Sequence, residues 1–451
     1  MPGLTANTVA SGIRTVGSVE TDAKVTNFLK KIGKEIPHGT FPMLGILKGS
    51  RSITTPSQNV KWYDKPFPWQ IATVAGVYTS KDCKIGNVYV DAASAVGTLL
   101  YLKITDLDNF NQFRVDREVM LFEGGNSRNE VVGLVTDKSR EGAYGILGIT
   151  LKQVAPYVNG AAPTGYGLSD ADTIRVISNR RPEFGAAPAG IIYNKTQYEQ
   201  VTGISVTPIR VSRSARAQEF RTGDAYKEAA SDAIDLHGQE LEMSSMFSVF
   251  DNTSTGDNGE AQWSPDGFLT VTKEHGLTDD YKYSTSYGVT GKSWADGGLD
   301  WLEGHLTEVG RFQHDYVCVC GYKVMKALQQ LVRANSQYGI VGTETKFGTK
   351  VTKFVLPGMT LSFFTHPLWQ GDDTRASQMW IIDPSSMAMA TLKDGDTTHI
   401  KTAKELEDRV GATAAWVDGT IEVILTEYTF LYRFPNHWAL LSGIGETNLM
   451  S

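Results

Sequence analysis

Two stretches of the sequence approach known ion-binding patterns. SYGVTGKS, Ser286–Ser293, resembles a phosphate-binding loop, but that loop needs a glycine five residues before the Gly-Lys pair, where Ser286 stands. The preceding LTDDYKYSTS is polar, so we expect no apolar strand leading into the loop. We interpret this segment as a glycine turn and not as a nucleotide site.

The second stretch, DNTSTGDNGE at Asp251–Glu260, has the oxygen-rich composition of a calcium loop. The twelfth position counted from Asp251 is Gln262, where the calcium loop requires a glutamate. The third and fifth positions are Thr253 and Thr255. We therefore predict a polar loop and no calcium site.

No other group of reactive side chains forms a catalytic pattern. His237 and Glu240 share a predicted helix without an HExxH motif, and no serine lies in a G-x-S-x-G turn. The carboxylate pairs Asp279-Asp280 and Asp372-Asp373 lie in polar segments, where solvation explains them. We predict no catalytic, cofactor-binding or metal-binding residues, no cofactor, and a protein that is not an enzyme.

The sparse cysteines argue against a disulfide framework. There are three, Cys83, Cys318 and Cys320, and the last two would share one face of a strand in DYVCVCG. We expect reduced, buried thiols. The N-terminus has no apolar signal segment, and no run approaches the length of a membrane span. These features favour a protein made in a reducing cytoplasm, without a membrane partner.

Charge and composition narrow the class further. The 451 residues are 41% hydrophobic with a net charge of −7, which predicts folded domains and argues against a dedicated nucleic-acid binder. Arg210, Arg213, Arg216 and Arg221 form a local basic patch. We interpret this patch as a solvated or salt-bridged segment.

The clearest predicted element is a long helix within Arg221–Asn252. Thr222 or Asp224 can cap its N-terminus, and the chain has no proline until well beyond it. Three- and four-residue spacing predicts a buried stripe of Tyr226, Ala229, Ala233, Leu236, Met243, Phe247 and Phe250. Gly238 interrupts the helix at a cost of about 1 kcal/mol. Because the stripe begins with alanines, we expect a spine that lies close against a sheet.

The regions on either side of this spine differ in pattern. Residues 22–37 predict a short amphipathic helix after a flexible arm. From about Ser57 to Val206, short β-like runs alternate with Gly, Asp and Asn, with no clear core of their own. After the spine, helices and strands are interleaved, as the following segments predict: helices in GLDWLEGHLTEVG, GYKVMKALQQLVRANS and AKELEDR, and strands in HDYVCVC, VTKFVLPGMTLSFFTH, QMWIIDPSSMAMATL and GTIEVILTEYTFLYRFPNHWALLSGI.

Three of these stretches resemble the tailed-bacteriophage major capsid protein of the Hong Kong ninety-seven type, in the branch with an enlarged extended-loop β region. They are TPIRVSRSARAQEFRTGDAYKEAASDAIDLHGQELE (Thr207–Glu242), MWIIDPSSMAMATLKD (Met379–Asp394), and His399–Ile444 with Glu427 and the Asn436-His437 turn. The resemblance covers the chain from about Thr207 onward.

The resemblance implies an α+β fold with a spine helix, a peripheral domain and an axial domain. It implies an N-terminal arm with a short helix at 1–56, and a β-rich extended loop with an inserted β subdomain at 57–206. The peripheral domain with the spine helix would occupy 207–262 and the axial domain 263–384. Residues 385–451 would return to the peripheral domain.

The function implied by the resemblance is structural. Such a chain would assemble with itself into pentamers and hexamers of an icosahedral virion shell around double-stranded DNA, in the host cytoplasm. Its partners would be portal, scaffold and decoration proteins, with non-specific contacts to packaged DNA. An encapsulin-like compartment shell protein and a β-rich enzyme stay open as alternatives.

Overall fold

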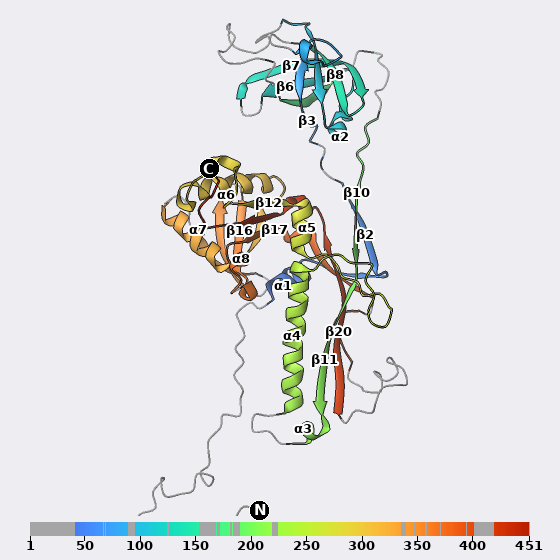
Figure 1. The fold of residues 1–451 in the computed structure, drawn as a ribbon, viewed down its shortest axis with the longest axis vertical. Coiled ribbons are helices and arrows are strands. Elements are labelled where there is room, and N and C mark those ends of the chain that lie inside the picture. Colours follow the sequence, from blue (N-terminus) through green and yellow to red (C-terminus); the bar gives the residue numbers. More distant parts are fainter. Residues whose placement is uncertain are drawn as a thin grey trace, which may run out of the picture. The chain divides into compact units, whose positions relative to one another are not determined.

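In the computed structural model, the chain divides into two compact units: Met1–Asp64 with Gln197–Ser451, and Lys65–Thr196 (Figure 1). We call them the main unit and the inserted unit. The structure describes residues 41–65, 67, 69–88, 95–123, 126–152, 168, 172–180, 183, 190–218, 224–334, 340–346, 349–356, 359–369, 371–393, 395–400 and 419–450.

The inserted unit is built on one seven-stranded antiparallel sheet. Its strand order is β3-β9-β6-β7-β8-β5-β4. The elements are β3 (Ile71–Thr73), β4 (Gly76–Tyr78), η3 (Ile85–Asn87), β5 (Leu99–Ile104), α2 (Leu107–Phe110), β6 (Arg117–Glu123), β7 (Asn126–Glu141), β8 (Tyr144–Leu151) and β9 (Thr173–Asn179). The short β-like runs predicted here are therefore largely confirmed. An exception is GNVYVDA, where Gly86 and Asn87 lie in η3 and Val88 forms only an isolated bridge.

A hydrophobic core of its own fills the inserted unit, which corrects the expectation that this region lacks one. The core residues are Ala72, Val74, Val77, Leu100, Leu102, Ile104, Phe110, Phe113, Val119, Leu121, Val131, Val135, Leu147, Ile149, Leu151, Leu168 and Ile174. Alternation along β5 shows how they gather, since Leu100, Leu102 and Ile104 are buried while Leu99 is exposed. The sequence pattern hid this core because it is assembled from many short strands.

The main unit contains two larger sheets and one strand pair. The five-stranded sheet runs β1 (Ser52–Thr55), β18 (Met387–Leu392), β20 (Gly419–Tyr432) and β11 (Gly203–Ser212), with β19 (Thr398–Ile400) also on β20. The seven-stranded sheet runs β12 (Leu277–Asp280), β21 (Ala439–Ser442), β17 (Met379–Ile382), β13 (Asp315–Cys320), β16 (Met359–Thr365), β15 (Thr349–Leu356) and β14 (Ile340–Lys346). Strands β2 (Asn59–Asp64) and β10 (Thr196–Val201) pair separately.

These pairings shift two of the expected segment boundaries. Residues 59–64, 197–201 and 203–206 lie in strands of the main unit, although they fall within the two ends of the expected loop region of 57–206. Strand β21 belongs to the seven-stranded sheet, although it falls in the expected return segment of 385–451. Both shifts arise because strands distant in sequence complete a sheet.

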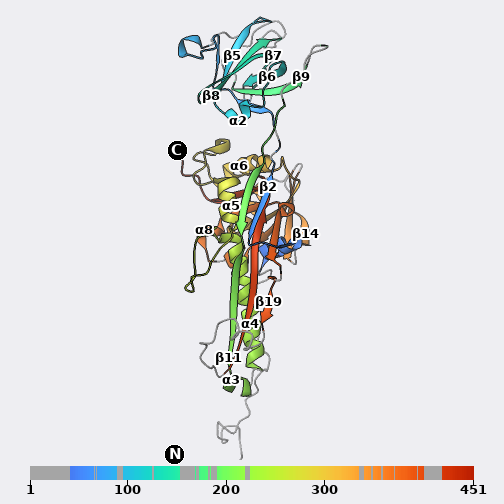
Figure 2. The same cartoon turned by 90° about the vertical axis from the view of Figure 1, so that its right-hand side faces the viewer.

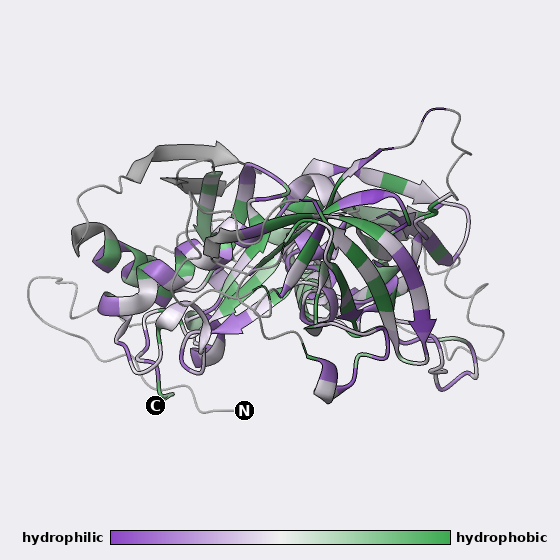
Figure 3. Ribbon diagram, turned by 90° about the horizontal axis from the view of Figure 1, so that it is seen from above, coloured by the Kyte–Doolittle hydropathy of each residue, from purple (hydrophilic) through white to green (hydrophobic). Residues whose placement is uncertain are grey.

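The seven-stranded sheet separates two cores. On one face, Tyr316, Cys318 and Cys320 pack with α6 (Trp294–Val309) and α7 (Tyr322–Ala334). On the other face, Val317 and Val319 pack with α1 (Pro42–Ser50), α5 (Phe268–His275) and residues of β18 and β20. The predicted helices at α6 and α7 and the strand at β13 are confirmed, and Val324, Leu328 and Leu331 of α7 are buried as expected. Because both faces of the sheet are covered, β13 is buried at every position from Tyr316 to Cys320. Figure 3 shows polar and apolar residues alternating along several strands, the pattern of a strand with one exposed face.

The spine helix is α4, Ala225–Phe247, and it lies alongside β11 and β20 in both views (Figures 1 and 2). Asp224 is its N-cap, with the side chain accepting from the Tyr226 amide at 2.9 Å. The helix ends at Phe247, not at Asp251-Asn252, because the chain turns extended at Ser248.

The predicted stripe is correct in the first half of α4; in the second half Phe247 packs against the core as predicted, but Leu236 and Met243 do not. Ala233 is buried and Ala229 packs beside it, but Leu236 is 49% exposed and Met243 is 40% exposed. The buried positions of the second half are His237, Leu241, Glu242, Ser245 and Met246. The prediction followed apolar residue types, whereas polar His237 and Glu242 occupy the buried face because they have partners there.

Some observed elements were not predicted, and some predicted elements fall outside the described residues. Helices α1 and α5 and the short strand β12, whose residues are mostly polar, were not predicted. The short segments completing the fold are α3 (Arg213–Ala217), η5 (Ser286–Gly288), η6 (Pro367–Trp369), α8 (Asp373–Ala376), η7 (Pro384–Ser386) and η8 (Pro435–His437). The predicted helices at 22–37 and in AKELEDR lie outside the described residues. Within the described part of the chain, no helix is long and apolar enough to cross a membrane.

Candidate functional site

The spine helix and its strand pair form a thin two-layer structure, which we call the blade (α4, β11 and β20). Strands β11 and β20 are antiparallel, with Val206 opposite Leu425 and Arg210 opposite Ile421. The inner strand residues meet the alanine face of the helix in a small cluster of Ile209, Val211, Ala233 and Ile424. Small side chains let the helix approach the strands closely, which explains the alanine stripe.

His237 joins the helix to both strands. Its Nδ1 lies 2.9 Å from Thr207 Oγ1 on β11, and its Nε2 lies 2.8 Å from Thr426 Oγ1 on β20. Burial lowers the pKa of His237, so the imidazole is neutral at pH 7 and serves as a hydrogen-bonding link. Glu240 also accepts a hydrogen bond from Thr207 at 3.2 Å. These two residues therefore have a structural role and form no metal pair.

Glu242 holds the N-terminus of α1, an arrangement that the sequence pattern did not reveal. The amides of Met43 and Leu44 donate to Oε1 and Oε2 of Glu242, each at 2.8 Å. His366 Nε2 lies 2.9 Å from Oε1, and the side chains of His366 and Glu242 are fully buried. The free amides and positive dipole of a helix start favour a carboxylate at this position. We call this group the Glu242 clamp.

Gly238 on the same helix has a packing reason. A Cβ at this position would lie 2.9 Å from the ring of Phe41, the residue that precedes α1. Phe41 packs against the core that α1 and α4 share. The glycine therefore makes room for the chain that leads into the clamp, which offsets its unfavourable helix propensity.

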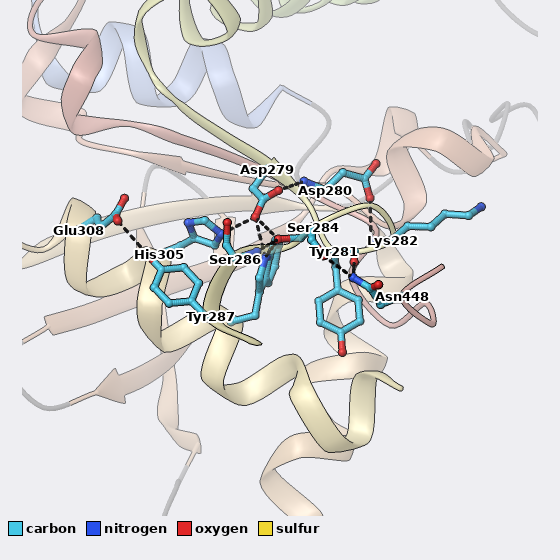
Figure 4. Close-up of polar contacts among 11 residues, drawn as sticks. Asp279, Asp280, Tyr281, Lys282, Ser284, Ser286, Tyr287, His305, Glu308 and Asn448 are labelled. Atoms are coloured by element: carbon cyan, nitrogen blue, oxygen red, sulfur yellow. Dashed lines mark hydrogen bonds and ion pairs between the residues drawn. The ribbon is translucent and has the colours of Figure 1, made fainter. Parts of the chain in front are cut away.

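A second polar cluster centres on Asp279 at the end of β12 (Figure 4). Its Oδ2 accepts from Ser284 Oγ at 2.6 Å and Trp301 Nε1 at 2.8 Å, and lies 2.8 Å from His305 Nε2. Burial by itself raises the pKa of Asp279, but these hydrogen bonds outweigh it and bring the pKa down to about 2. The aspartate is therefore a charged acceptor that ties β12 and the following loop to α6.

The geometry of this cluster does not support nucleophilic catalysis. Ser284 donates to Asp279, whose pKa of about 2 makes it too weak a base to activate a serine, and His305 bonds to Asp279 as well. Asn448 holds the same loop from the other side, with Nδ2 donating to the carbonyls of Tyr281 and Ser284 at 2.7 Å each. The cluster is a structural anchor for residues 281–293.

The two loops with ion-binding patterns form hydrogen bonds to other groups of the same chain. In Ser286–Ser293, Gly288 and Gly291 have positive φ, and the Gly291 amide donates to Asn448 Oδ1 at 3.1 Å. In the other loop, Asp251 accepts from the amides of Thr253 and Ser254 at 2.8 and 3.1 Å, and also from both hydroxyls. Hydrogen bonds, first that of the Ser254 hydroxyl, lower the pKa of Asp251 well below its usual range. Among the described residues, no group of His, Cys, Asp and Glu is arranged to hold a metal ion.

The cysteines are free and buried, as predicted. Burial raises the pKa of the Cys320 thiol to about 12, and that of Cys318 well above its usual value. In the predicted basic patch, Arg210 and Arg213 are exposed, and the Arg216 guanidinium lies 5.3 Å from the Tyr226 ring centre. Arg221 lies outside the described residues.

The blade leaves several large apolar side chains exposed to water. On the outer face of β11, Ile204 is 57% exposed and Val206 is 48% exposed. On α4, Ile234 is also exposed, together with Leu236 and Met243. Apolar side chains gathered on one thin element are typical of surfaces that contact another chain.

Comparison with known proteins places these features in a family context. The family model of the SU10 major capsid protein matches residues 10–445. A chain from the cyanophage A-1(L) capsid is similar at 11% identity, covering 95% of this chain and 99% of that chain with a TM-score of 0.44. A chain from Microbacterium phage Oxtober96 is 12% identical, covering 93% and 96% with a TM-score of 0.41.

A chain of the SrpI encapsulin complex of Synechococcus elongatus is 10% identical, covering 56% of this chain and 77% of that chain with a TM-score of 0.35. No curated protein matches the chain.

Proposed function

The chain belongs to the SU10 major capsid protein family, and from that premise we propose that it assembles into pentamers and hexamers of an icosahedral shell around double-stranded DNA. Membership makes it a structural protein of a bacteriophage capsid, located in the virion. The α+β fold with a long spine helix fits a major capsid protein. Because the matching family is viral, the encapsulin-like alternative is not favoured.

The main support for the proposal is that the blade is only two layers thick, with one helix packed on two strands. Its inner cluster is small, and Ile204, Val206 and Leu236 remain exposed. Fully burying an exposed apolar side chain of this size contributes about 1.5–3 kcal/mol, and these half-exposed side chains would contribute part of that on contact with a neighbour. Repeated contacts with neighbouring copies would bury these side chains, as closed assemblies of one chain require.

The inserted unit has a proposed role between subunits. We propose that the inserted unit, Lys65–Thr196, acts as a β-rich arm that reaches a neighbouring copy. Its exposed strand edges favour pairing or packing with another chain. The portal, a scaffold protein, decoration proteins and packaged DNA, contacted non-specifically, are the further proposed partners, with assembly in the host cytoplasm.

Light scattering and electron microscopy of the purified chain at tens of micromolar test the assembly. We expect capsomers or closed shells. A monodisperse monomer under all salt and crowding conditions would contradict the proposal. Shells that form without nucleic acid and retain a protein cargo would favour the compartment alternative.

A deletion separates the contribution of the inserted unit. We expect replacement of residues 65–195 by a short Gly/Ser linker to abolish shells while circular dichroism still reports a folded, helical main unit. The main unit keeps its own cores, which lie around α6, α7 and the seven-stranded sheet. Shells from the deleted chain would show that the arm is decoration, and an unfolded remnant would show that it belongs to the subunit core.

A further inference from the structure

The main unit contains a cavity that none of the roles above uses. It has a volume of about 520 Å³ and lies where the β2–β10 pair meets α5 and the turn after α4. Its lining includes Trp62 and Tyr198 from the strands, with Glu274 and His275 from the end of α5. We call it the α5 cavity.

The charge of the α5 cavity is negative. Glu199, Asp266 and Glu274 line it, and no lysine or arginine does so among the described residues. Lys61 pairs with Glu199 at 2.9 Å, so one of the three carboxylates has a cation. The only described ion-pair contact of Glu274 is with its neighbour His275 at 3.7 Å.

Asp266 carries a partly buried carboxylate in this lining. Its Oδ1 accepts from the Phe250 amide at 2.8 Å, and the carboxylate also bonds to the Gln200 side chain. Burial raises the pKa of Asp266, and the nearby Glu274 carboxylate adds to that rise. Two carboxylates that repel each other in this way favour a bound cation.

A buried donor in the lining lacks a partner within the described chain. Trp62 is 8% exposed, and its Nε1 makes no hydrogen bond. Gln200, by contrast, bonds to both the amide and the carboxylate of Asp266. Buried donors normally have acceptors. A ligand that offers a carbonyl oxygen would supply one to Trp62.

Aromatic rings complete the lining. Trp62 and Tyr198 stack with centroids 5.8 Å apart, and His275 lies edge-on to Tyr198 at 5.5 Å. Such rings suit the aliphatic stem of a lysine or arginine, and ring faces attract its cationic head. The cavity therefore offers partners for a cation, an aliphatic stem and a backbone carbonyl together.

We propose that the α5 cavity binds a lysine or arginine side chain, with its adjoining backbone carbonyl, from a neighbouring copy of this chain. The inference rests on the proposed shell, in which each copy holds its neighbours at a high effective concentration. The inserted unit supplies complementary charges. Arg140, Lys152 and Arg175 are exposed there and have no partner among the described residues.

A cryo-electron microscopy map of wild-type shells tests the occupant. We expect side-chain density in the α5 cavity, between Asp266 and Glu274, that is continuous with a neighbouring subunit. An empty cavity, density joined to a different protein, or isolated density such as that of a polyamine would each overturn the proposal. If the wild-type chain forms no shells, the proposed function fails and this inference fails with it.

A charge reversal tests the contribution of the cavity to assembly. We expect Glu274→Lys to lower the yield of shells about tenfold by excluding a basic side chain, with the melting temperature of the unassembled subunit unchanged. Glu274→Gln should give an intermediate yield. Glu260→Lys is the matched control, since Glu260 is an exposed carboxylate outside the cavity lining, and it should assemble normally. Equal yields for Glu274→Lys and Glu260→Lys, with normal wild-type shells, would overturn this inference alone.

Discussion

The inserted unit and the blade use apolar residues in opposite ways. The inserted unit closes its seven-stranded sheet around a core in which Leu100, Val119 and Ile149 are fully buried. The blade has one helix on one face of two strands, and it leaves Ile204, Leu236 and other large side chains exposed. A region that buries its own apolar residues can fold before it meets a partner, whereas a thin region gains from contacts that only a partner supplies.

This difference reverses one expectation from the sequence. The β-rich region was expected to have no clear core of its own, but residues 65–196 have the core of an independent domain. Within the part of the chain that the structure describes, the blade is the region that we propose depends more on neighbours. The inserted unit would therefore reach another copy as a folded body.

The largest loss of stability is expected from a substitution in the Glu242 clamp, which joins the blade to α1. Glu242→Ala leaves the Met43 and Leu44 amides and His366 without their shared acceptor in a fully buried place. We expect a loss of about 3–5 kcal/mol in the free energy of unfolding, measured by urea on unassembled subunits. The control Glu240→Ala removes a neighbouring exposed carboxylate and should cost less than about 1 kcal/mol. Similar losses for both would mean that the clamp is not a stabilising centre.

The second largest loss of stability is expected in the core of the inserted unit. A Cβ at Gly145 would lie 2.4 Å from the ring of the buried Phe110. Gly145→Val should therefore cost about 3 kcal/mol, the upper end of the usual overpacking range.

The control for this prediction is Gly190→Ala, where a Cβ meets no atom within 4 Å. Urea unfolding of unassembled subunits, followed in the inserted unit, measures both variants. Tolerance of Gly145→Val would indicate that this unit is loosely packed, and the contrast with the blade would be lost.

A smaller effect is expected on the inner face of the blade. Ala233 is buried against Ile209 and Val211, so Ala233→Leu should overpack the contact and cost about 1–3 kcal/mol. Ala229→Leu should act in the same direction, while Lys227→Leu on the exposed face should cost little. Thermal unfolding of the three variants measures the difference. Equal stabilities would show that the helix does not pack closely on the strands.

These predictions show what the sequence could and could not reveal. The spine helix, its cap at Asp224 and the alanine face follow from local spacing and capping, which act within a few residues. The Glu242 clamp could not be predicted, because its partners Met43 and Leu44 are 199 and 198 residues away. An acidic residue on a buried helix face was the only signal, and it identifies no partner. The α5 cavity likewise joins residues from Trp62 to Tyr432.

Reductant is expected to have the smallest effect on stability, close to none. Cys83, Cys318 and Cys320 are free, so the melting temperatures of both units should not change when reductant is added. Burial keeps Cys318 and Cys320 protonated at pH 8, so native protein should resist alkylation at these positions by iodoacetamide. Mass spectrometry after labelling measures this. A fall in melting temperature with reductant would indicate bridges between subunits.

Hydrogen–deuterium exchange compared between unassembled subunits and shells tests the contrast between the two regions most directly. Peptides from β6, β7 and β8 should exchange slowly in both states, because their core is complete within one chain. Peptides from α4, β11 and β20 should exchange faster in the free subunit and become protected in the shell. Fast exchange of β6–β8 in the free subunit, with a blade already fully protected there, would contradict this assignment of self-contained and neighbour-dependent regions.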